Sequence, residues 1–79
     1  MRVELRLFAS LGKYASHPMI STEGIMDLPS LITVGDLVDR LGIPRQEIKL
    51  IFLNGVHAHL DSKVNENDRL GLFPPIGGG

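Results

Sequence analysis

The dipeptide Asn54-Gly55 is the sequence feature that most restricts how this chain can fold. Asn-Gly readily adopts the two positive φ angles of a type I′ turn, whose twist matches that of a two-residue β-hairpin loop. The residues before it, 48–53, are nearly all apolar, and those after it, 56–60, alternate between apolar side chains and histidine. Strict alternation is typical of a half-buried strand. The sequence therefore predicts two antiparallel strands joined by a tight turn.

Three further segments have the patterns of strands. Apolar and charged residues alternate over residues 3–7, which predicts a half-buried first strand and leaves Phe8 on its outer face. Residues 19–28 carry apolar side chains around a polar break, as expected of an edge strand with a turn or bulge. Residues 70–73 suit a short last strand. The stretch 61–68 is polar and is expected to be a loop.

One main helix is predicted between the edge strand and the hairpin. Thr33 and Asp36 have the spacing of a capping box, and apolar residues follow at helical spacing as far as Leu41. Gly42 stands where a left-handed C-terminal cap belongs. Residues 9–15 allow a second, short helix. The order of strand, edge strand, helix, hairpin and strand predicts an α+β domain of the β-grasp type, with one helix packed across a mixed sheet.

Length and composition disfavour several classes of function. The 79 residues correspond to one domain, and we expect no separate catalytic domain. Eight Lys and Arg against nine Asp and Glu leave a net charge of −1, which disfavours nucleic acid as a partner. Without cysteine the chain has no disulfide, no thiolate metal site and no cysteine nucleophile. Its first residues contain no long apolar segment, so we expect no membrane association and a cytoplasmic location.

The last six residues, Pro74-Pro75-Ile76-Gly77-Gly78-Gly79, differ in composition from the rest of the chain. Two prolines stiffen the exit from the last strand, and the side chains then disappear toward the carboxylate. Such a segment can extend about 20 Å, far enough to enter a narrow channel in a partner enzyme. We therefore predict a β-grasp domain at 1–73 and a flexible tail at 74–79, whose reactive group is the carboxylate of Gly79. An inert, frayed end is the alternative.

An exposed apolar patch is predicted beside the base of this tail. If Phe52 and its alternate neighbours face the helix, then Ile51 and Leu53 lie on the opposite face of the sheet. The same argument puts Phe8 and Phe73 on that face. Exposed patches of this kind usually mark an interface, so these four side chains and residues 73–78 are the predicted partner-binding surface. If the register of the strand at 48–53 were shifted by one residue, Ile51 and Leu53 would face the core instead.

The remaining polar residues do not indicate a catalytic or metal site. His57 and His59 share one face of their predicted strand and could, with His17, bind a metal ion, but no acidic or cysteine partner is placed to complete the site. Exposed strand histidines are the better interpretation. The acidic residues at 36, 39, 61, 66 and 68 are interpreted as cap, solvated-face and turn residues. We predict no metal and no bound cofactor.

Taken together, these motifs resemble the MoaD/ThiS family of ubiquitin-like sulfur carriers, over essentially the whole chain. The matching segments are Thr33-Val34-Gly35-Asp36-Leu37, Leu53-Asn54-Gly55, Asn67-Asp68-Arg69-Leu70 and Phe73-Pro74-Pro75-Ile76-Gly77-Gly78-Gly79. The opening Leu5-Arg6-Leu7-Phe8-Ala9 and the Phe-Pro-Pro ending are closer to the MoaD type, the small subunit of molybdopterin synthase, than to the thiazole-synthesis carrier ThiS.

The resemblance implies a protein co-substrate rather than an enzyme. In that family an adenylyltransferase of the ubiquitin-activating type uses ATP to adenylate the C-terminal carboxylate, here that of Gly79, and a sulfur donor converts it to a thiocarboxylate. The sulfur then passes to an acceptor enzyme, the large subunit of molybdopterin synthase in the MoaD type, so a role in molybdenum- or tungsten-cofactor synthesis is expected. The alternatives are another sulfur-transfer pathway such as thiamin thiazole synthesis, a ubiquitin-like modifier joined to lysines, and an interaction domain with an inert tail.

Overall fold

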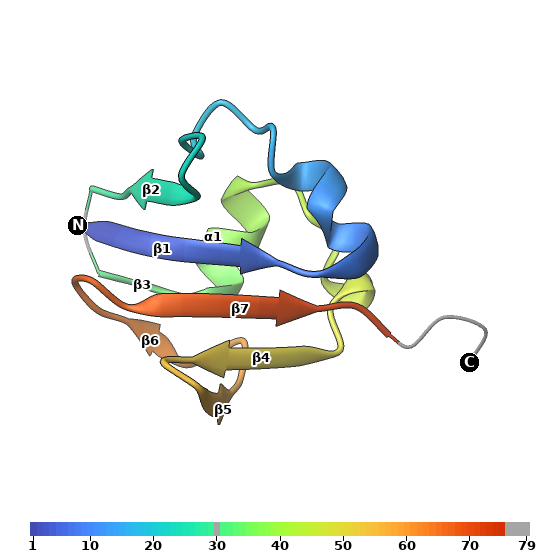
Figure 1. Cartoon of the computed structure of the whole chain (residues 1–79). Coiled ribbons are helices and arrows are strands. Elements are labelled where there is room, and N and C mark those ends of the chain that lie inside the picture. Colours follow the sequence, from blue (N-terminus) through green and yellow to red (C-terminus); the bar gives the residue numbers. More distant parts are fainter. Residues whose placement is uncertain (30, 76–79) are drawn as a thin grey trace.

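The computed structural model describes residues 1–29 and 31–75. Within them, five strands form one sheet in the order β2-β1-β7-β4-β5, as Figure 1 shows. These strands are β1 (Arg2–Leu7), β2 (Ile25–Asp27), β4 (Leu50–Leu53), β5 (Val56–Ala58) and β7 (Arg69–Phe73). The central neighbours β1 and β7 are parallel, and the other three pairs are antiparallel. The predicted mixed sheet, with its second strand at an edge, is confirmed.

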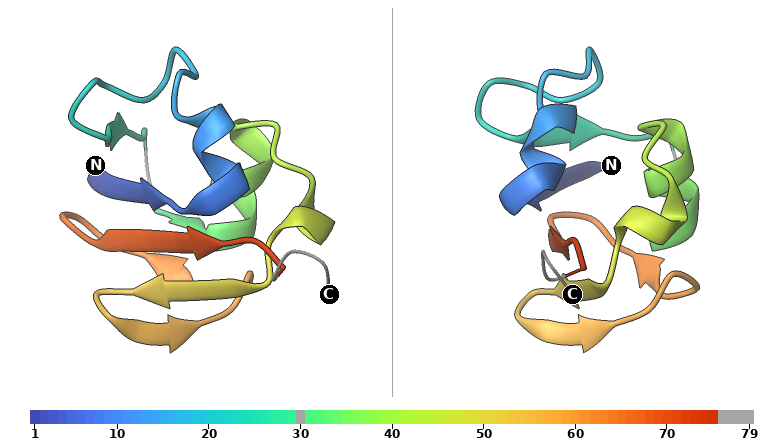
Figure 2. Two further views of the ribbon diagram at one scale, coloured as in Figure 1. Left: turned by 45° about the vertical axis from the view of Figure 1, so that its right-hand side comes forward. Right: turned by 90° about the vertical axis from the view of Figure 1, so that its right-hand side faces the viewer.

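The main helix α1 (Val34–Arg40) packs across one face of this sheet (Figure 2). It begins as predicted, because the side chain of Thr33 accepts a hydrogen bond from the Asp36 N–H at 3.1 Å and the Asp36 carboxylate accepts one from the Thr33 N–H at 3.2 Å. It ends just before Gly42, whose φ of 73° is the left-handed conformation that glycine adopts without steric cost. None of the helices in the described ranges has the length and hydrophobicity of a transmembrane segment.

Two short 3₁₀ helices lie at the end of the sheet toward which β1 and β7 run (Figures 1 and 2). They are η1 (Ala9–Tyr14), which corresponds to the short helix expected at 9–15, and η2 (Arg45–Glu47). The Tyr14 hydroxyl donates a hydrogen bond to the Glu47 carboxylate at 3.1 Å, and the Lys13 ammonium lies 3.6 Å from the same carboxylate. Partial burial and the neighbouring carboxylate raise the pKa of Tyr14, so this hydroxyl stays protonated as the donor that links the two helices.

A second, two-stranded sheet was not expected from the sequence. The strands β3 (Ile32–Thr33) and β6 (Lys63–Val64) pair antiparallel, with Ile32 opposite Val64. The segment 61–68 was predicted as a loop because a two-residue strand is too short to produce an alternating pattern. Its one apolar residue, Val64, is fully buried. The pair closes the core beneath the start of α1.

The hydrophobic core fills the space between the sheet and α1. On β1, Val3 and Leu5 are buried while Arg2 and Arg6 are exposed, which confirms the predicted alternation. The other buried apolar side chains are Leu11, Met26, Leu28, Ile32, Val34, Leu37, Val38, Leu41, Ile43, Ile51, Ala58, Val64, Leu70 and Leu72. Both layers therefore contribute, as a domain of this size requires.

The predicted orientation of β4 is wrong. Ile51 is 6% exposed and belongs to the core, and Leu53 is half-buried and packs against the core. Phe52 takes the outer face instead. The reason is that the strand residues 50–53 are apolar on both faces and give no phase. Ile48 and the one polar residue, Lys49, lie before the strand, in the extended segment that follows η2. The prediction took Ile48 as a strand residue facing the helix, which also turned Leu50 and Phe52 toward the helix. This shifts the alternation by one residue and reverses the face assigned to every side chain of β4.

Candidate functional site

The outer face of the sheet, opposite α1, presents three phenylalanines from three segments of the chain. Phe8 and Phe73 stack face to face, with ring centroids 4.2 Å apart and planes 4° from parallel. Phe52 meets Phe73 edge on, at 5.7 Å between centroids and 81° between planes. Both geometries are favourable for aromatic pairs. We call Phe8, Phe52 and Phe73 the aromatic patch.

The stack follows from the pairing of the two central strands. Leu7 lies beside Leu72 in the parallel register, so Phe8 and Phe73, which come next, meet where β1 leaves the sheet. The Phe8 N–H donates to the Leu72 carbonyl at 3.1 Å and holds the two segments together. Because Leu72 is buried, alternation turns Phe73 outward. The predicted outward orientation of Phe8 and Phe73 is confirmed, whereas their role in binding a partner stays a prediction.

Phe52 is the member of the patch that sequence reasoning missed, and Ile51 and Leu53 are the two residues it wrongly included. A signal for the correct assignment was present. A two-residue hairpin loop at Asn54-Gly55 requires Phe52 to lie opposite His57, and directly opposite residues share a face. Since His57 is polar and exposed, Phe52 must face outward with it.

A hollow of about 360 Å³ lies on this face over Gly71, the middle residue of β7. It is lined by Arg6, Phe8, Phe52, Gly55, Arg69, Gly71 and Phe73. A methyl group at Gly71 would lie 3.5 Å from the ring of Phe8 and 3.8 Å from the ring of Phe73. These are ordinary contact distances, so the fold itself does not require a glycine at position 71. Its missing side chain leaves the floor of the hollow open.

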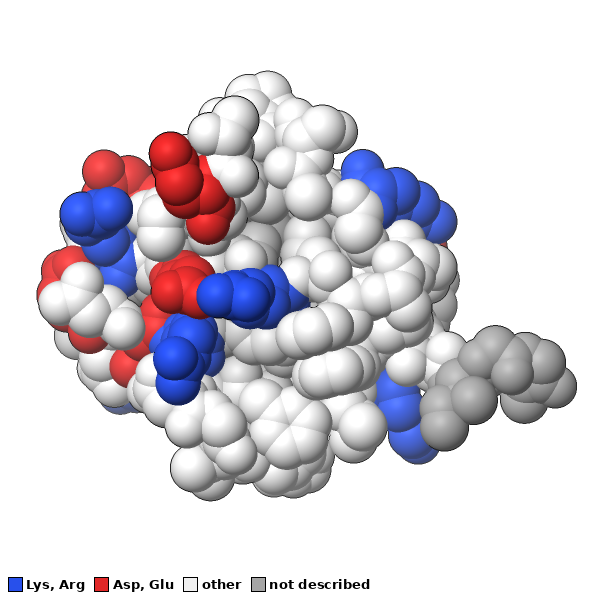
Figure 3. All heavy atoms as spheres, in the orientation of Figure 1, with Lys and Arg blue, Asp and Glu red and all other residues white. Residues whose placement is uncertain are grey.

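Most of the charged side chains on this face gather at one end of it. Lys and Arg mix with Asp and Glu over the end of the sheet where β1 begins, and two of the arginines, Arg6 and Arg69, line the hollow together with the three phenylalanines (Figure 3). The Arg6 guanidinium bonds the Glu4 carboxylate at 2.8 Å. Within residues 1–29 and 31–75, the Arg69 side chain forms no ion pair. The hollow therefore has apolar walls and an arginine border.

The base of the predicted tail adjoins the aromatic patch. Strand β7 ends at Phe73, whose carbonyl accepts a hydrogen bond from the Lys49 N–H at 2.7 Å. Pro74 is half-buried and Pro75 is exposed. The remaining predicted site residues, Ile76, Gly77, Gly78 and Gly79, lie outside the described residues. A central strand of the sheet thus leads directly from the patch into the C-terminal segment (Figure 1).

The three histidines lie on two different parts of the fold. His57 and His59 are both exposed, with ring centroids 5.0 Å apart. His17 lies between η1 and β2, where its Nδ1 accepts a hydrogen bond from the Met19 N–H at 3.1 Å. The interpretation of both histidines as exposed residues is confirmed, but β5 ends at Ala58, so His57 is a strand residue and His59 follows the strand.

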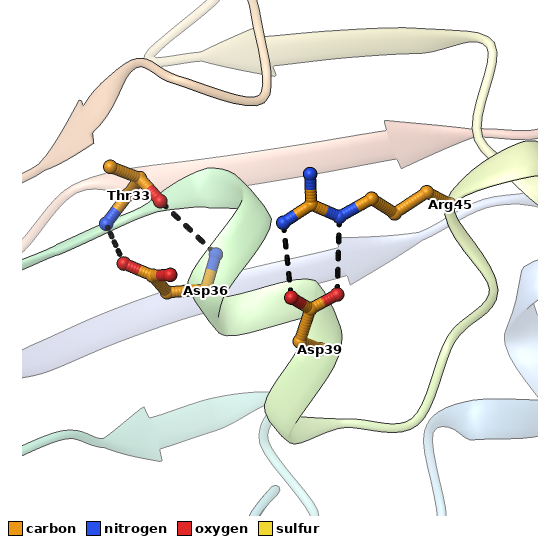
Figure 4. Close-up of polar contacts among 4 residues, drawn as sticks. All are labelled: Thr33, Asp36, Asp39 and Arg45. Atoms are coloured by element: carbon orange, nitrogen blue, oxygen red, sulfur yellow. Dashed lines mark hydrogen bonds and ion pairs between the residues drawn. The ribbon is translucent and has the colours of Figure 1, made fainter.

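The acidic residues serve local structure. Hydrogen bonds from the backbone and side chain of Thr33 hold the pKa of Asp36 below its ordinary value of 3.8. Asp39 forms two hydrogen bonds with Arg45, at 3.2 and 3.0 Å, which tie α1 to η2 (Figure 4). The Asp68 carboxylate accepts from the Asn54 side chain at 2.9 Å and the Asn65 N–H at 2.8 Å. Cap and turn roles for Asp36 and Asp68 are therefore confirmed.

The fold and the patch together define a class of protein. A mixed sheet with parallel central strands β1 and β7, one helix across it and an exposed face beside the C-terminal segment make a ubiquitin-like β-grasp protein. The model of the Mut7-C ubiquitin family matches residues 1–76, and the chain belongs to that family. No curated protein matches the chain significantly.

Solved structures share this fold over nearly the whole chain. SAMP1 from Haloferax volcanii is 28% identical, with a TM-score of 0.70 and 100% of both chains covered. Another crystal structure, of small archaeal modifier protein 1 from the same organism, is 29% identical with a TM-score of 0.68, covering 95% of this chain and 98% of that one. A putative molybdopterin converting factor, subunit 1, from Pyrococcus furiosus is 22% identical with a TM-score of 0.67, covering 96% and 99%. The chain thus has the fold shared by ubiquitin-like carrier and modifier proteins.

Proposed function

We propose that the protein is a sulfur carrier in molybdopterin synthesis whose reactive group is the carboxylate of Gly79. A carboxylate oxygen attacks the α-phosphorus of ATP in an activating adenylyltransferase, and pyrophosphate leaves. A hydrosulfide donor then attacks the acyl carbon and displaces AMP, so that one oxygen of the terminus is replaced by sulfur. An acceptor enzyme, such as a molybdopterin synthase large subunit, takes the sulfur and returns the carboxylate. The protein acts as a co-substrate in the cytoplasm and binds no cofactor of its own.

The position of the Phe8–Phe73 stack at the base of the C-terminal segment is the observation that supports this proposal best. A partner that covers the aromatic patch buries apolar surface and has Pro74-Pro75 at the edge of the contact. The sheet then fixes where Pro75 stands relative to that partner. The glycines that follow in the sequence let an enzyme approach the backbone from every side.

A second candidate function is that of a protein modifier, in which a lysine amine rather than hydrosulfide attacks the same activated carboxylate. The two Haloferax volcanii structures, one of them named as a modifier protein, favour it. The molybdopterin assignment is favoured by the name of the Pyrococcus furiosus structure and by the Phe-Pro-Pro ending. Sulfur supply to thiamin thiazole or to another pathway uses the same first two steps.

Intact-mass spectrometry distinguishes these functions. The 79-residue chain is incubated with a purified adenylyltransferase, ATP and sulfide, and its mass is compared with that of the untreated chain. Exchange of one oxygen for sulfur supports the carrier, lysine conjugates support the modifier, and an unchanged mass contradicts both. The control variant lacks Gly78 and Gly79 and should not load. Its thermal unfolding should match that of the intact chain, because a large loss of stability would mean that the tail is packed structure.

A further inference from the structure

We propose that the hollow over Gly71 receives a protein partner that presents a bulky apolar side chain followed by a carboxylate, which pairs with Arg69. The inference rests on the proposed function, since it specifies the surface of the partner that docks beside the tail. The apolar side chain of the partner lies over Gly71, and its carboxylate lies at the border of the hollow, beside Arg69.

The apolar contact follows from the walls of the hollow. Three phenylalanine rings surround a floor at which Gly71 provides no side chain. The hollow has a volume of about 360 Å³ and is open to solvent, so its apolar walls are in contact with water when no partner is bound. Release of water from apolar walls favours an apolar occupant. One large aliphatic or aromatic side chain fits this requirement.

The charged contact follows from the border of the hollow. Two arginines, Arg6 and Arg69, line the hollow, and none of the described residues that line it is acidic. Glu4 lies beside Arg69 in the β1–β7 register, but its carboxylate bonds Arg6. Arg69 is exposed and, in the part of the chain described, has no ion pair of its own. A guanidinium in this state is suited to a carboxylate, which it can bind through two parallel hydrogen bonds.

The spacing along β7 defines the arrangement that the partner needs. Arg69 and Gly71 are two residues apart on one strand, a separation of about 7 Å. Side chains four residues apart on a helix have Cβ atoms about 6 Å apart, which is close to this value. A partner helix with an apolar residue at position i and a glutamate at i+4 therefore reaches both contacts. Its apolar end lies nearer to Phe73 and the tail.

The test uses the ¹⁵N-labelled chain and two synthetic helical peptides that differ at one position. Both carry leucine at position i, and position i+4 is glutamate in one and lysine in the other. We expect the glutamate peptide to shift the amide signals of Gly71 and Arg69 and to bind about tenfold more tightly than the lysine peptide, as loss of a charge-assisted contact predicts. Arg69→Glu should reverse this preference. Arg40→Glu, an exposed charge change on α1, is the matched control and should leave it unaltered.

A second variant tests the apolar contact. Gly71→Ala fills the floor at ordinary contact distances and should weaken both peptides while the rest of the spectrum stays the same. Equal affinity for the two peptides, no binding of either, or shifts confined to another face would overturn the proposal. Self-association of the chain that Arg69→Glu abolishes would identify a second copy as the occupant, and would also overturn it.

The outcome is separable from that of the proposed function. Arg69→Glu and Gly71→Ala leave the tail intact, and the peptide titration requires neither ATP nor activation of Gly79. If the peptides bind as expected and sulfur loading fails, the docking surface stands and the carrier function falls. If loading succeeds and the peptides do not discriminate, only the inference about the hollow falls.

Discussion

Phe52 lies directly opposite His57 across the β4–β5 hairpin, and their rings meet at 5.8 Å between centroids and 66° between planes. The same register puts Ile51 opposite Ala58 on the face toward α1, where both are buried. Two adjacent residues of one strand therefore lie in different environments. Ile51 stabilises the core, and Phe52 forms the surface on which a partner is expected to dock.

Truncation of these two residues should separate stability from binding. Ile51→Ala should lower the free energy of unfolding by about 2–4 kcal/mol, because it removes buried methylenes and leaves a cavity. Phe52→Ala should cost about 1 kcal/mol, since the half-buried ring loses mainly its aromatic contacts. Urea denaturation followed by circular dichroism measures both values. A larger loss for Phe52→Ala would show that the register of β4 is not the one described.

The capping box should make stability depend on acid pH through Asp36. The pKa of this carboxyl is lower in the folded chain than the ordinary 3.8, so its ionised form stabilises the fold. That contribution is complete above the ordinary pKa and is lost as the pH falls through the lower, folded-state value. The difference in unfolding free energy between the wild-type chain and Asp36→Asn should therefore shrink in acid. Asp61→Asn, an exposed loop change, serves as the control, and a difference that stays constant with pH would contradict the prediction.

An added methyl group at Gly35 should destabilise the fold modestly. Its N–H donates to the Leu60 carbonyl at 2.7 Å, and a methyl group there would lie 2.7 Å from Nη2 of Arg45 and 3.2 Å from that same carbonyl oxygen. The Arg45 guanidinium is the end of an exposed side chain and can move away at the expense of its surface pair with Asp39, whereas the Leu60 carbonyl is backbone and has to shift by a few tenths of an ångström. We expect Gly35→Ala to cost about 1 kcal/mol of stability, at the low end of the range for overpacking. Gly12→Ala, with nothing within 4 Å, should be neutral or slightly stabilising in the same thermal unfolding measurement.

The stack of Phe8 on Phe73 should be measurable as a coupling energy. Phe8 is 40% exposed, so Phe8→Ala should lower stability modestly, and a double-mutant cycle with Phe73→Ala should give a coupling of about 1 kcal/mol. Phe8→Ala should also weaken binding to the adenylyltransferase in titration calorimetry. Leu31→Ala, which removes a side chain that is 65% exposed, should leave that affinity unchanged. Additive stabilities for the Phe8 and Phe73 variants would argue against the stack.

The sequence by itself determined the elements whose signals act over a few residues. The capping box of Thr33 and Asp36, the left-handed cap at Gly42 and the tight turn at Asn54-Gly55 each depend on neighbouring side chains and backbone, and all are found in the structure. The tail composition that suggests Gly79 as the reactive group is also a local property. The alternation on β1 identified Phe8 as an outward residue because its charged neighbours mark one face unambiguously.

Tertiary structure decided most of the rest of the site. Residues 50–53 are apolar on both faces, so their own periodicity does not orient the strand; its pairing with β5 across the Asn54-Gly55 turn, and with β7, makes Phe52 an outer residue and Ile51 a core residue. The β3–β6 pair, the contact of Phe8 with Phe73 and the hollow over Gly71 join segments far apart in the chain. Registers of this kind are set by the apolar surface that the whole domain buries at once. Apart from the β4–β5 hairpin, no window of a few residues contains that information.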